Sequence, residues 1–147
     1  ETLNERTNGN IALVLTGSGT VDIPSGMRST VYDPGFVSEQ EKRDAMAGAL
    51  AFCHPSTNES FGIVLMEAWL AGTPCLVHSG SPALKYHCRE SNGGLWFRTY
   101  PEFEEEVNLL AQNGKVRFLM GSSGRKYVLK NYSWETIDRK FLAALDA

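Results

Sequence analysis

The sequence has no long hydrophobic run, no run of like charge and no paired-cysteine motif, and each absence excludes a class of function. No apolar stretch approaches the length of a bilayer span, and no signal peptide is recognisable. Basic residues occur at most in pairs such as Lys42-Arg43, and the formal net charge is -3. We therefore expect neither a membrane span nor nucleic acid as a partner.

Cysteine is also scarce, with only Cys53, Cys75 and Cys88 and no C-x-x-C spacing. An odd number of cysteines without regular spacing is typical of reduced thiols in a cytoplasmic protein. His87 adjoins Cys88, but neighbouring side chains on a helix or strand point apart and make poor zinc ligands. We expect no metal, no cofactor and a cytoplasmic location, with any membrane association made peripherally by a part of the protein that this chain lacks.

The sequence does have the balance of one ordinary globular domain: 147 residues, 42% hydrophobic and 21% charged. Short apolar runs predict strands at 11–15, 29–33, 50–54, 75–78 and 95–97. Helices are predicted at 38–48, 62–71, 82–89, 101–113 and 115–131, with a last one beginning at 133. Strands that alternate with helices predict an α/β fold, a single Rossmann-like, doubly wound parallel sheet. Such sheets bind ligands beyond the carboxyl ends of their strands.

Two helix starts carry informative polar residues. Ser38 and Glu41 have the spacing of a capping box, in which each side chain accepts a backbone amide hydrogen of the other residue. The helix predicted at 101–113 begins with four glutamates that we expect to be solvated and favourable to the helix dipole: Glu102, Glu104, Glu105 and Glu106.

The most informative segment is 54–69, where a strand ends, a polar loop follows and a helix begins. The unpaired amides of a first helical turn form an anion site suited to phosphate. Gly62 lies in this turn, and its lack of a side chain would let a pyrophosphate approach closely.

Two carboxylates, Glu59 and Glu67, flank this helix start. At 1.5 Å per helical residue they lie roughly 8–10 Å apart, about the span from sugar to ribose in a nucleotide diphosphate sugar. Carboxylates accept charge-assisted hydrogen bonds from sugar hydroxyls. Alternatively, Glu59 is only a solvated acid favourable to the helix N-terminus. Glu67 has apolar neighbours on both sides, where a carboxylate is costly unless it is partnered.

The Glu59-x7-Glu67 spacing, with Phe61-Gly62 inside it and Pro55-Ser56 before it, resembles the signature of retaining family-4 glycosyltransferases with the GT-B architecture. Further matching segments cover most of the chain: Gly35-Phe36-Val37-Ser38, Ala71-Gly72-Thr73-Pro74, Ser91-Asn92-Gly93-Gly94-Leu95, Gly124-Arg125 and Tyr132-Ser133-Trp134. In such enzymes the second of two Rossmann-like domains binds the donor. The resemblance implies that residues 1–147 are this domain, one half of a GT-B fold, lacking its first strand and the N-terminal acceptor domain.

The resemblance also implies a role for individual residues. Glu59 is the expected catalytic residue, contacting donor-sugar hydroxyls, and Glu67 the expected ribose ligand. The donor phosphates are expected to bind at Ser60, Phe61, Gly62, Ile63 and Val64, and the base at Phe36 and Val37. Gly17 and Gly19 are expected to form a turn that faces the cleft. The sequence contains no Asp-x-Asp, in keeping with GT-B enzymes that need no metal.

The expected function is transfer of a hexose-type sugar, with retention, from a UDP-, GDP- or ADP-linked donor to an acceptor. The family's Arg and Lys that neutralise the leaving diphosphate belong to the absent first strand. We therefore expect the isolated chain to bind donor weakly or not at all and to be inactive. Two alternatives stay open: a non-catalytic sugar-nucleotide-binding module and a sugar-nucleotide epimerase domain.

Other motifs carry less weight. Gly17-Ser18-Gly19 hints at a dinucleotide fingerprint, but Asp22 occupies the third glycine position. His54 and His78 end predicted strands, and we interpret them as packed or capping residues. His87 is considered as an acceptor contact. Core or interdomain packing is the expectation for the three tryptophans Trp69, Trp96 and Trp134.

Overall fold

The computed structural model describes residues 11–146. The chain divides into two compact units, Glu1–Ala45 and Met46–Ala147. Each unit is described by itself below.

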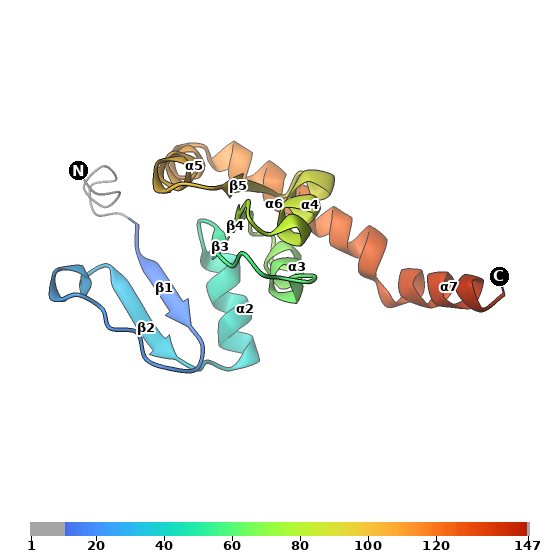
Figure 1. Ribbon diagram of the computed structural model, residues 1–147, viewed down its shortest axis with the longest axis horizontal. Coiled ribbons are helices and arrows are strands. Elements are labelled where there is room, and N and C mark those ends of the chain that lie inside the picture. The colour runs from blue at the N-terminus through green and yellow to red at the C-terminus, as the bar shows by residue number, and fades with distance from the viewer. Residues whose placement is uncertain (1–10, 147) are drawn as a thin grey trace. The chain divides into compact units, whose positions relative to one another are not determined.

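The first unit contains a parallel pair of strands, β1 (Leu13–Thr16) and β2 (Val31–Gly35), coloured blue in Figure 1. A 3-10 turn, η1 (Ser25–Met27), lies in the connection between them. Leu13 lies opposite Val31, and the register shifts between Val14 and Thr16. The predicted strands at 11–15 and 29–33 are therefore present, each displaced toward the C-terminus by one or two residues.

Helix α2 (Glu39–Gly48) begins with the predicted capping box. The backbone N–H of Ser38 donates to Glu41 Oε2 at 2.8 Å, and the N–H of Glu41 donates to Ser38 Oγ at 3.2 Å. Both bonds satisfy amides that would otherwise lack an intrahelical acceptor. The prediction is confirmed.

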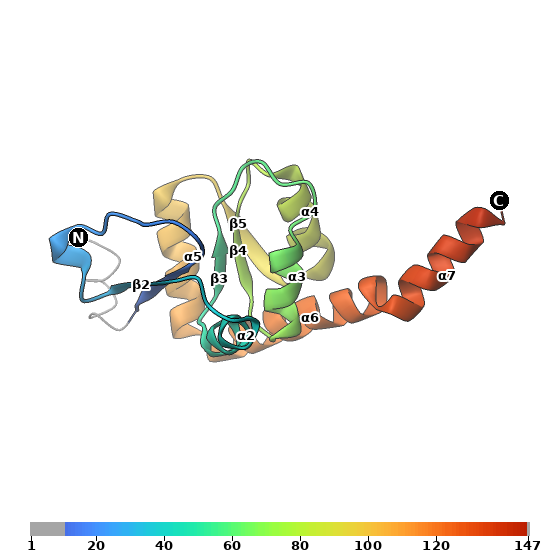
Figure 2. The same ribbon diagram turned by 90° about the horizontal axis from the view of Figure 1, so that it is seen from below.

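The second unit is built on a parallel sheet of β3 (Phe52–His54), β4 (Cys75–His78) and β5 (Gly94–Phe97), in that order. Its helices are α3 (Ile63–Leu70), α4 (Pro82–Ser91), α5 (Tyr100–Gln112), α6 (Gly114–Tyr132) and α7 (Trp134–Leu145). Figure 2 shows α3 and α4 on one face of this sheet and α5 on the other. Helices on both faces of parallel strands define a doubly wound fold.

The predicted α/β class with parallel strands is confirmed. In the first unit β1 pairs with β2, and in the second unit the strand order is β3-β4-β5. Apolar periodicity identifies a strand but contains no information about which neighbour it pairs with.

The core of the second unit centres on α3. Leu65, Ala68 and Trp69 are fully buried, and Trp69 donates its indole N–H to the carbonyl of Gly93 at 2.8 Å. Helix α6 crosses this helix closely, because a Cβ atom at Gly124 would overlap with the Trp69 ring. Trp69 is therefore a core residue, as the sequence suggests.

Two of the four glutamates of α5 are not solvated as predicted. Thr99 caps the helix in a box with Glu102, and Glu104 lies on the inward face of the helix with Val107. Glu104 is 8% exposed. Glu106 is half-buried, and burial, reinforced by the charge of Glu102, raises the pKa of Glu106 to about 7. The apolar spacing of this helix indicates its buried face but does not show that Glu104 and Glu106 are covered as well.

Candidate functional site

The start of α3 has the geometry of an anion site. Gly62 is the N-cap residue, and within the described part of the chain no side chain bonds to the first amides of the helix. The carbonyl of Gly62 accepts the N–H of Leu65 at 3.0 Å, so the helical ladder begins here. Ile63 is 67% exposed, which leaves the first turn open to solvent. Its free amides and the helix dipole together favour a bound anion.

Gly62 is fixed by both backbone conformation and packing. Its φ is +82°, in the left-handed region where side chains with a Cβ are strained. A Cβ atom at this position would also overlap with Leu84 Cδ2 of α4. Absence of a side chain therefore lets the loop turn into α3 while lying directly against α4.

Glu59 lies in the loop before α3 and has a specific partner. Its Oε1 is 3.2 Å from Nε2 of His54, the last residue of β3, and both side chains are largely shielded, at 31% and 20% exposure. This contact pairs His54 with Glu59, a pairing that sequence reasoning missed. The available signal was a histidine at a strand end, five residues before the acid.

Glu67 lies in the second turn of α3, between buried Met66 and Ala68. Its side chain is half-buried, and the Oε2 atom is shielded from solvent. A carboxylate at such a position is held in a restricted set of orientations, which suits a ligand contact better than a solvated surface acid would.

The loops that follow β3 and β4 meet at one edge of the sheet. The N–H of Gly80 donates to His78 Nδ1 at 3.0 Å, and a Cβ atom at Gly80 would lie 3.2 Å from Cγ2 of Thr57. His78 is therefore a capping residue, as predicted. The carboxyl edge of the sheet thus brings together the loop that contains Glu59 and the loop that leads into α4, where doubly wound folds bind ligands.

In the first unit, the turn after β1 lies against the end of β2, because the N–H of Gly17 donates to the carbonyl of Gly35 at 3.0 Å. Gly17 and Gly19 both have positive φ, as a tight turn requires. Phe36 follows Gly35 and is 84% exposed, whereas Val37 is half-buried. The contact of Phe36 and Val37 with a base stays a prediction.

His87, which was considered above as an acceptor contact, is buried. Its side chain is 5% exposed and lies on the inner face of α4 with Leu84 and Cys88. Its Nδ1 is 3.0 Å from the hydroxyl of Tyr127. A histidine at this depth has its hydrogen-bonding partner within the protein.

Cys75 and Cys88 are buried, and Cys53 is half-buried. Burial raises the pKa of the Cys53 thiol to about 11 and that of Cys88 to about 12, and the charge of Glu106 adds to both shifts. Over residues 11–146, no three His, Cys, Asp or Glu side chains gather as a metal site. Over the same residues, no helix combines the length and apolarity that crossing a bilayer requires.

Comparison with known proteins agrees with this geometry. Residues 2–127 match the family described as "Glycosyl transferases group 1". A protein of Methanocaldococcus jannaschii, the uncharacterized glycosyltransferase MJ1607, is 30% identical over 143 residues, which cover 89% of this chain and 36% of the relative. The chain thus spans about a third of the length of that relative.

Solved structures share the fold at low sequence identity. HepE of Anabaena, solved in complex with UDP, has a TM-score of 0.76 at 18% identity, covering 92% of this chain and 41% of that one. TarM has a TM-score of 0.81 at 16% identity, covering 99% and 30%. WaaG, a glycosyltransferase involved in lipopolysaccharide biosynthesis, has a TM-score of 0.73 at 22% identity, covering 92% and 38%.

The family match extends over most of the chain and includes β3 to α5 and the first part of α6, up to residue 127. The chain therefore belongs to the glycosyl transferases group 1 family.

Proposed function

We propose that residues 1–147 form the donor-binding domain of a retaining family-4 glycosyltransferase with the GT-B architecture. The reaction is transfer of a hexose-type sugar from a UDP-, GDP- or ADP-linked donor to an acceptor. The observation that carries this proposal is the uncapped start of α3 at Gly62, flanked by Glu59 and Glu67. HepE, a structure of the same fold, contains UDP in one complex and UDP-glucose in another.

In this proposal the diphosphate lies on the backbone from Ser60 to Val64, where free amides and the helix dipole stabilise its charge. Glu67 accepts hydrogen bonds from the ribose, and Glu59, oriented by His54, accepts them from the donor sugar. The base lies against Phe36 and Val37. Because bond cleavage transfers negative charge to the leaving diphosphate, the contribution of the site is positioning and electrostatic stabilisation.

The reaction also needs an acceptor site and positive charge on the diphosphate. We propose that both come from a further part of the protein, an N-terminal domain together with a preceding strand that contains Arg and Lys. The full protein would act in the cytoplasm. This chain alone would bind donor weakly or not at all and transfer no sugar.

Calorimetric titration of the full-length protein with UDP-, GDP- and ADP-glucose tests the proposal. We expect one nucleotide series to bind. Glu67→Ala should weaken that binding by about 10- to 100-fold, because a charge-assisted hydrogen bond is worth roughly 1.5–3 kcal/mol. Glu135→Ala, which removes an exposed acid of α7, is the matched control and should bind like the parent.

Glu67→Ala binding as tightly as the parent would contradict the ribose role. Full-length protein that binds a sugar nucleotide but transfers nothing would instead support a non-catalytic module. Epimerised sugar released without an acceptor would support an epimerase domain.

A further inference from the structure

A buried polar residue of α4, His87, has no part in the proposed donor contacts. A polar side chain that is 5% exposed needs a partner within the protein, and His87 Nδ1 has one in the hydroxyl of Tyr127 on α6, at 3.0 Å. The same hydroxyl is 3.4 Å from that of Tyr132, at the end of α6. A hydrogen bond in such a shielded place fixes the orientation of the imidazole ring.

The ring of His87 in turn contacts the loop of the proposed donor site. The centroids of the Phe61 and His87 rings are 5.0 Å apart, with an interplanar angle of 76°. Phe61 packs against Tyr132 in the same way, at 5.2 Å and 83°. Edge-to-face packing on two sides restricts both the position and the tilt of the Phe61 ring.

Helix α4 therefore contacts two successive residues of this loop. Leu84 lies directly against Gly62, and His87, three residues further along the same helix face, lies against Phe61. The next backbone amide after Gly62 is that of Ile63, the first residue of α3. The two residues that precede the first amides of α3 are thus packed against α4.

We propose that His87, held by Tyr127, is a positioning residue that fixes the Phe61-Gly62 loop and so aims the first amides of α3. Burial lowers the pKa of His87, which agrees with a neutral ring whose task is orientation. The identity of the ligand, a nucleoside diphosphate, rests on the proposed function. The geometric part of the inference, a loop held through the hydrogen bond between His87 of α4 and Tyr127 of α6, does not depend on that function.

A matched pair of variants separates this role from general packing. Tyr127→Phe and Tyr132→Phe each remove one hydroxyl and keep the ring, but only the hydroxyl of Tyr127 bonds to His87. In the ligand-free chain, we expect Tyr127→Phe to shift the backbone amide NMR signals of residues 61–64. Tyr132→Phe should leave those signals close to their parent positions. Urea unfolding checks that both variants remain folded.

A double-mutant cycle tests whether Tyr127 acts through His87. His87→Ala should shift the same amides, and adding Tyr127→Phe to it should cause little further change, because the two residues form one unit. Unchanged 61–64 signals in both single variants would overturn the inference, as would fully additive effects. Equal shifts of the 61–64 amide signals in Tyr127→Phe and Tyr132→Phe would show that the two residues act by packing alone, and would also overturn the inference.

Titration of the same chain with UDP, GDP and ADP, followed by these amide signals, addresses the ligand. If a nucleotide shifts the parent signals, Tyr127→Phe should weaken its apparent binding by about tenfold and Tyr132→Phe by much less. Equal affinities of the parent and Tyr127→Phe would overturn the positioning role. Failure of every nucleotide to bind, also in the full-length protein, would count against the proposed function while the ligand-free signals still decide the inference.

Discussion

Gly62 shows how much one residue controls in this site. Its positive φ turns the loop into α3, and its missing side chain admits Leu84. From the sequence we expect Gly62 to let a phosphate approach the backbone closely. The structure adds a second reason for the same residue, which is contact with α4, and that reason depends on a neighbour 22 positions away in the chain.

Gly62→Ala should therefore destabilise the protein by about 2 kcal/mol or more, since a left-handed alanine costs roughly 1 kcal/mol and overpacking typically 1–3 kcal/mol. Urea unfolding measures the change. Gly48→Ala is the control, because a Cβ atom at the end of α2 meets no atom within 4 Å. Equal effects at the two positions would show that Leu84 moves aside freely.

Glu106 gives the stability of the protein a pH dependence. Its pKa is about 7 in the folded chain against 4.5 as the ordinary value. Between these two pH values the folded state binds this proton more tightly than the unfolded state, so raising the pH lowers the free energy of unfolding. Allowing for the partial exposure of Glu106, we expect a loss of about 1–2 kcal/mol between pH 4.5 and pH 8.

Glu106→Gln should remove this loss and make the protein more stable than the parent at pH 8. His87 has the opposite effect. Because its pKa is lowered in the folded state, the free energy of unfolding decreases as the pH falls through and below 6.5. The difference between parent and variant isolates Glu106, since both contain His87. Chemical unfolding at several pH values gives this difference, and a difference that does not change with pH would contradict the assignment.

At the scale of elements, the sequence predicts where helices and strands lie but not how closely they approach. The predicted strand at 75–78 coincides with β4, and the capping residues Ser38 and Ser133 stand immediately before α2 and α7. These features are local, because a cap or an apolar run depends on residues only a few positions apart. Helix contact is not local.

The contact between α3 and α6 depends on two glycines of α6. A Cβ atom at Gly121 would overlap with the carbonyl of Gly72, and one at Gly124 would overlap with the ring of Trp69. The two glycines are three residues apart and therefore share one helix face.

Gly124→Ala should lower the free energy of unfolding by about 2 kcal/mol or more, because a fully buried indole cannot yield without disturbing the core. Gly114→Ala, at the first residue of α6, should change it by less than about 0.5 kcal/mol, since its nearest neighbour is a flexible arginine atom at 3.6 Å. Thermal or urea unfolding of the two variants and the parent measures these changes in the free energy of unfolding. A similar, small effect at both positions would show that α6 does not approach α3 as closely as described.

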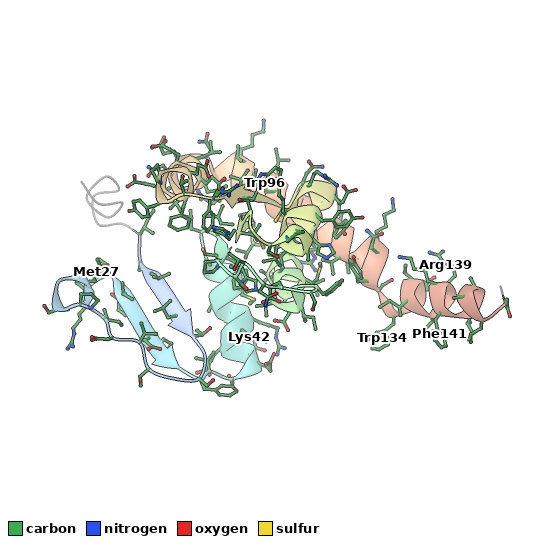
Figure 3. The ribbon with its side chains drawn as sticks, in the orientation of Figure 1. Met27, Lys42, Trp96, Trp134, Arg139 and Phe141 are labelled. Carbon is green, nitrogen blue, oxygen red and sulfur yellow. The ribbon has the colours of Figure 1, made fainter. Side chains whose placement is uncertain are left out.

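At the scale of the whole molecule, α7 leaves an apolar face uncovered. Trp134 is 80% exposed and Phe141 63%, and Figure 3 shows both on the same side of the helix, with Arg139 on the other. Leu142 and Leu145, at 58% and 67%, are also exposed. Large apolar side chains gathered on one helix are typical of a contact surface. Trp134 is therefore not a core residue, and interdomain packing of this side chain stays a prediction.

We expect the chain by itself to self-associate through this face at high concentration. The double variant Trp134→Ser, Phe141→Ser should reduce the sedimentation coefficient toward that of a monomer, with little change in stability, because the two side chains pack against little of the protein. Arg139→Ser is the control from the opposite side of α7 and should sediment like the parent. A parent that is monomeric at all concentrations would contradict this expectation.

The sequence by itself determined the α/β class, most element positions, the glycine at the start of α3 and the two acids on either side of it. Each of these depends on local spacing, which the order of residues specifies directly. Tertiary structure alone decided that β1 pairs with β2 and that β4 pairs with both β3 and β5, that His54 contacts Glu59, and that Glu106 is half-buried and His87 buried. Those features depend on which distant segments fold against one another, and a single sequence does not specify such contacts by its periodicity.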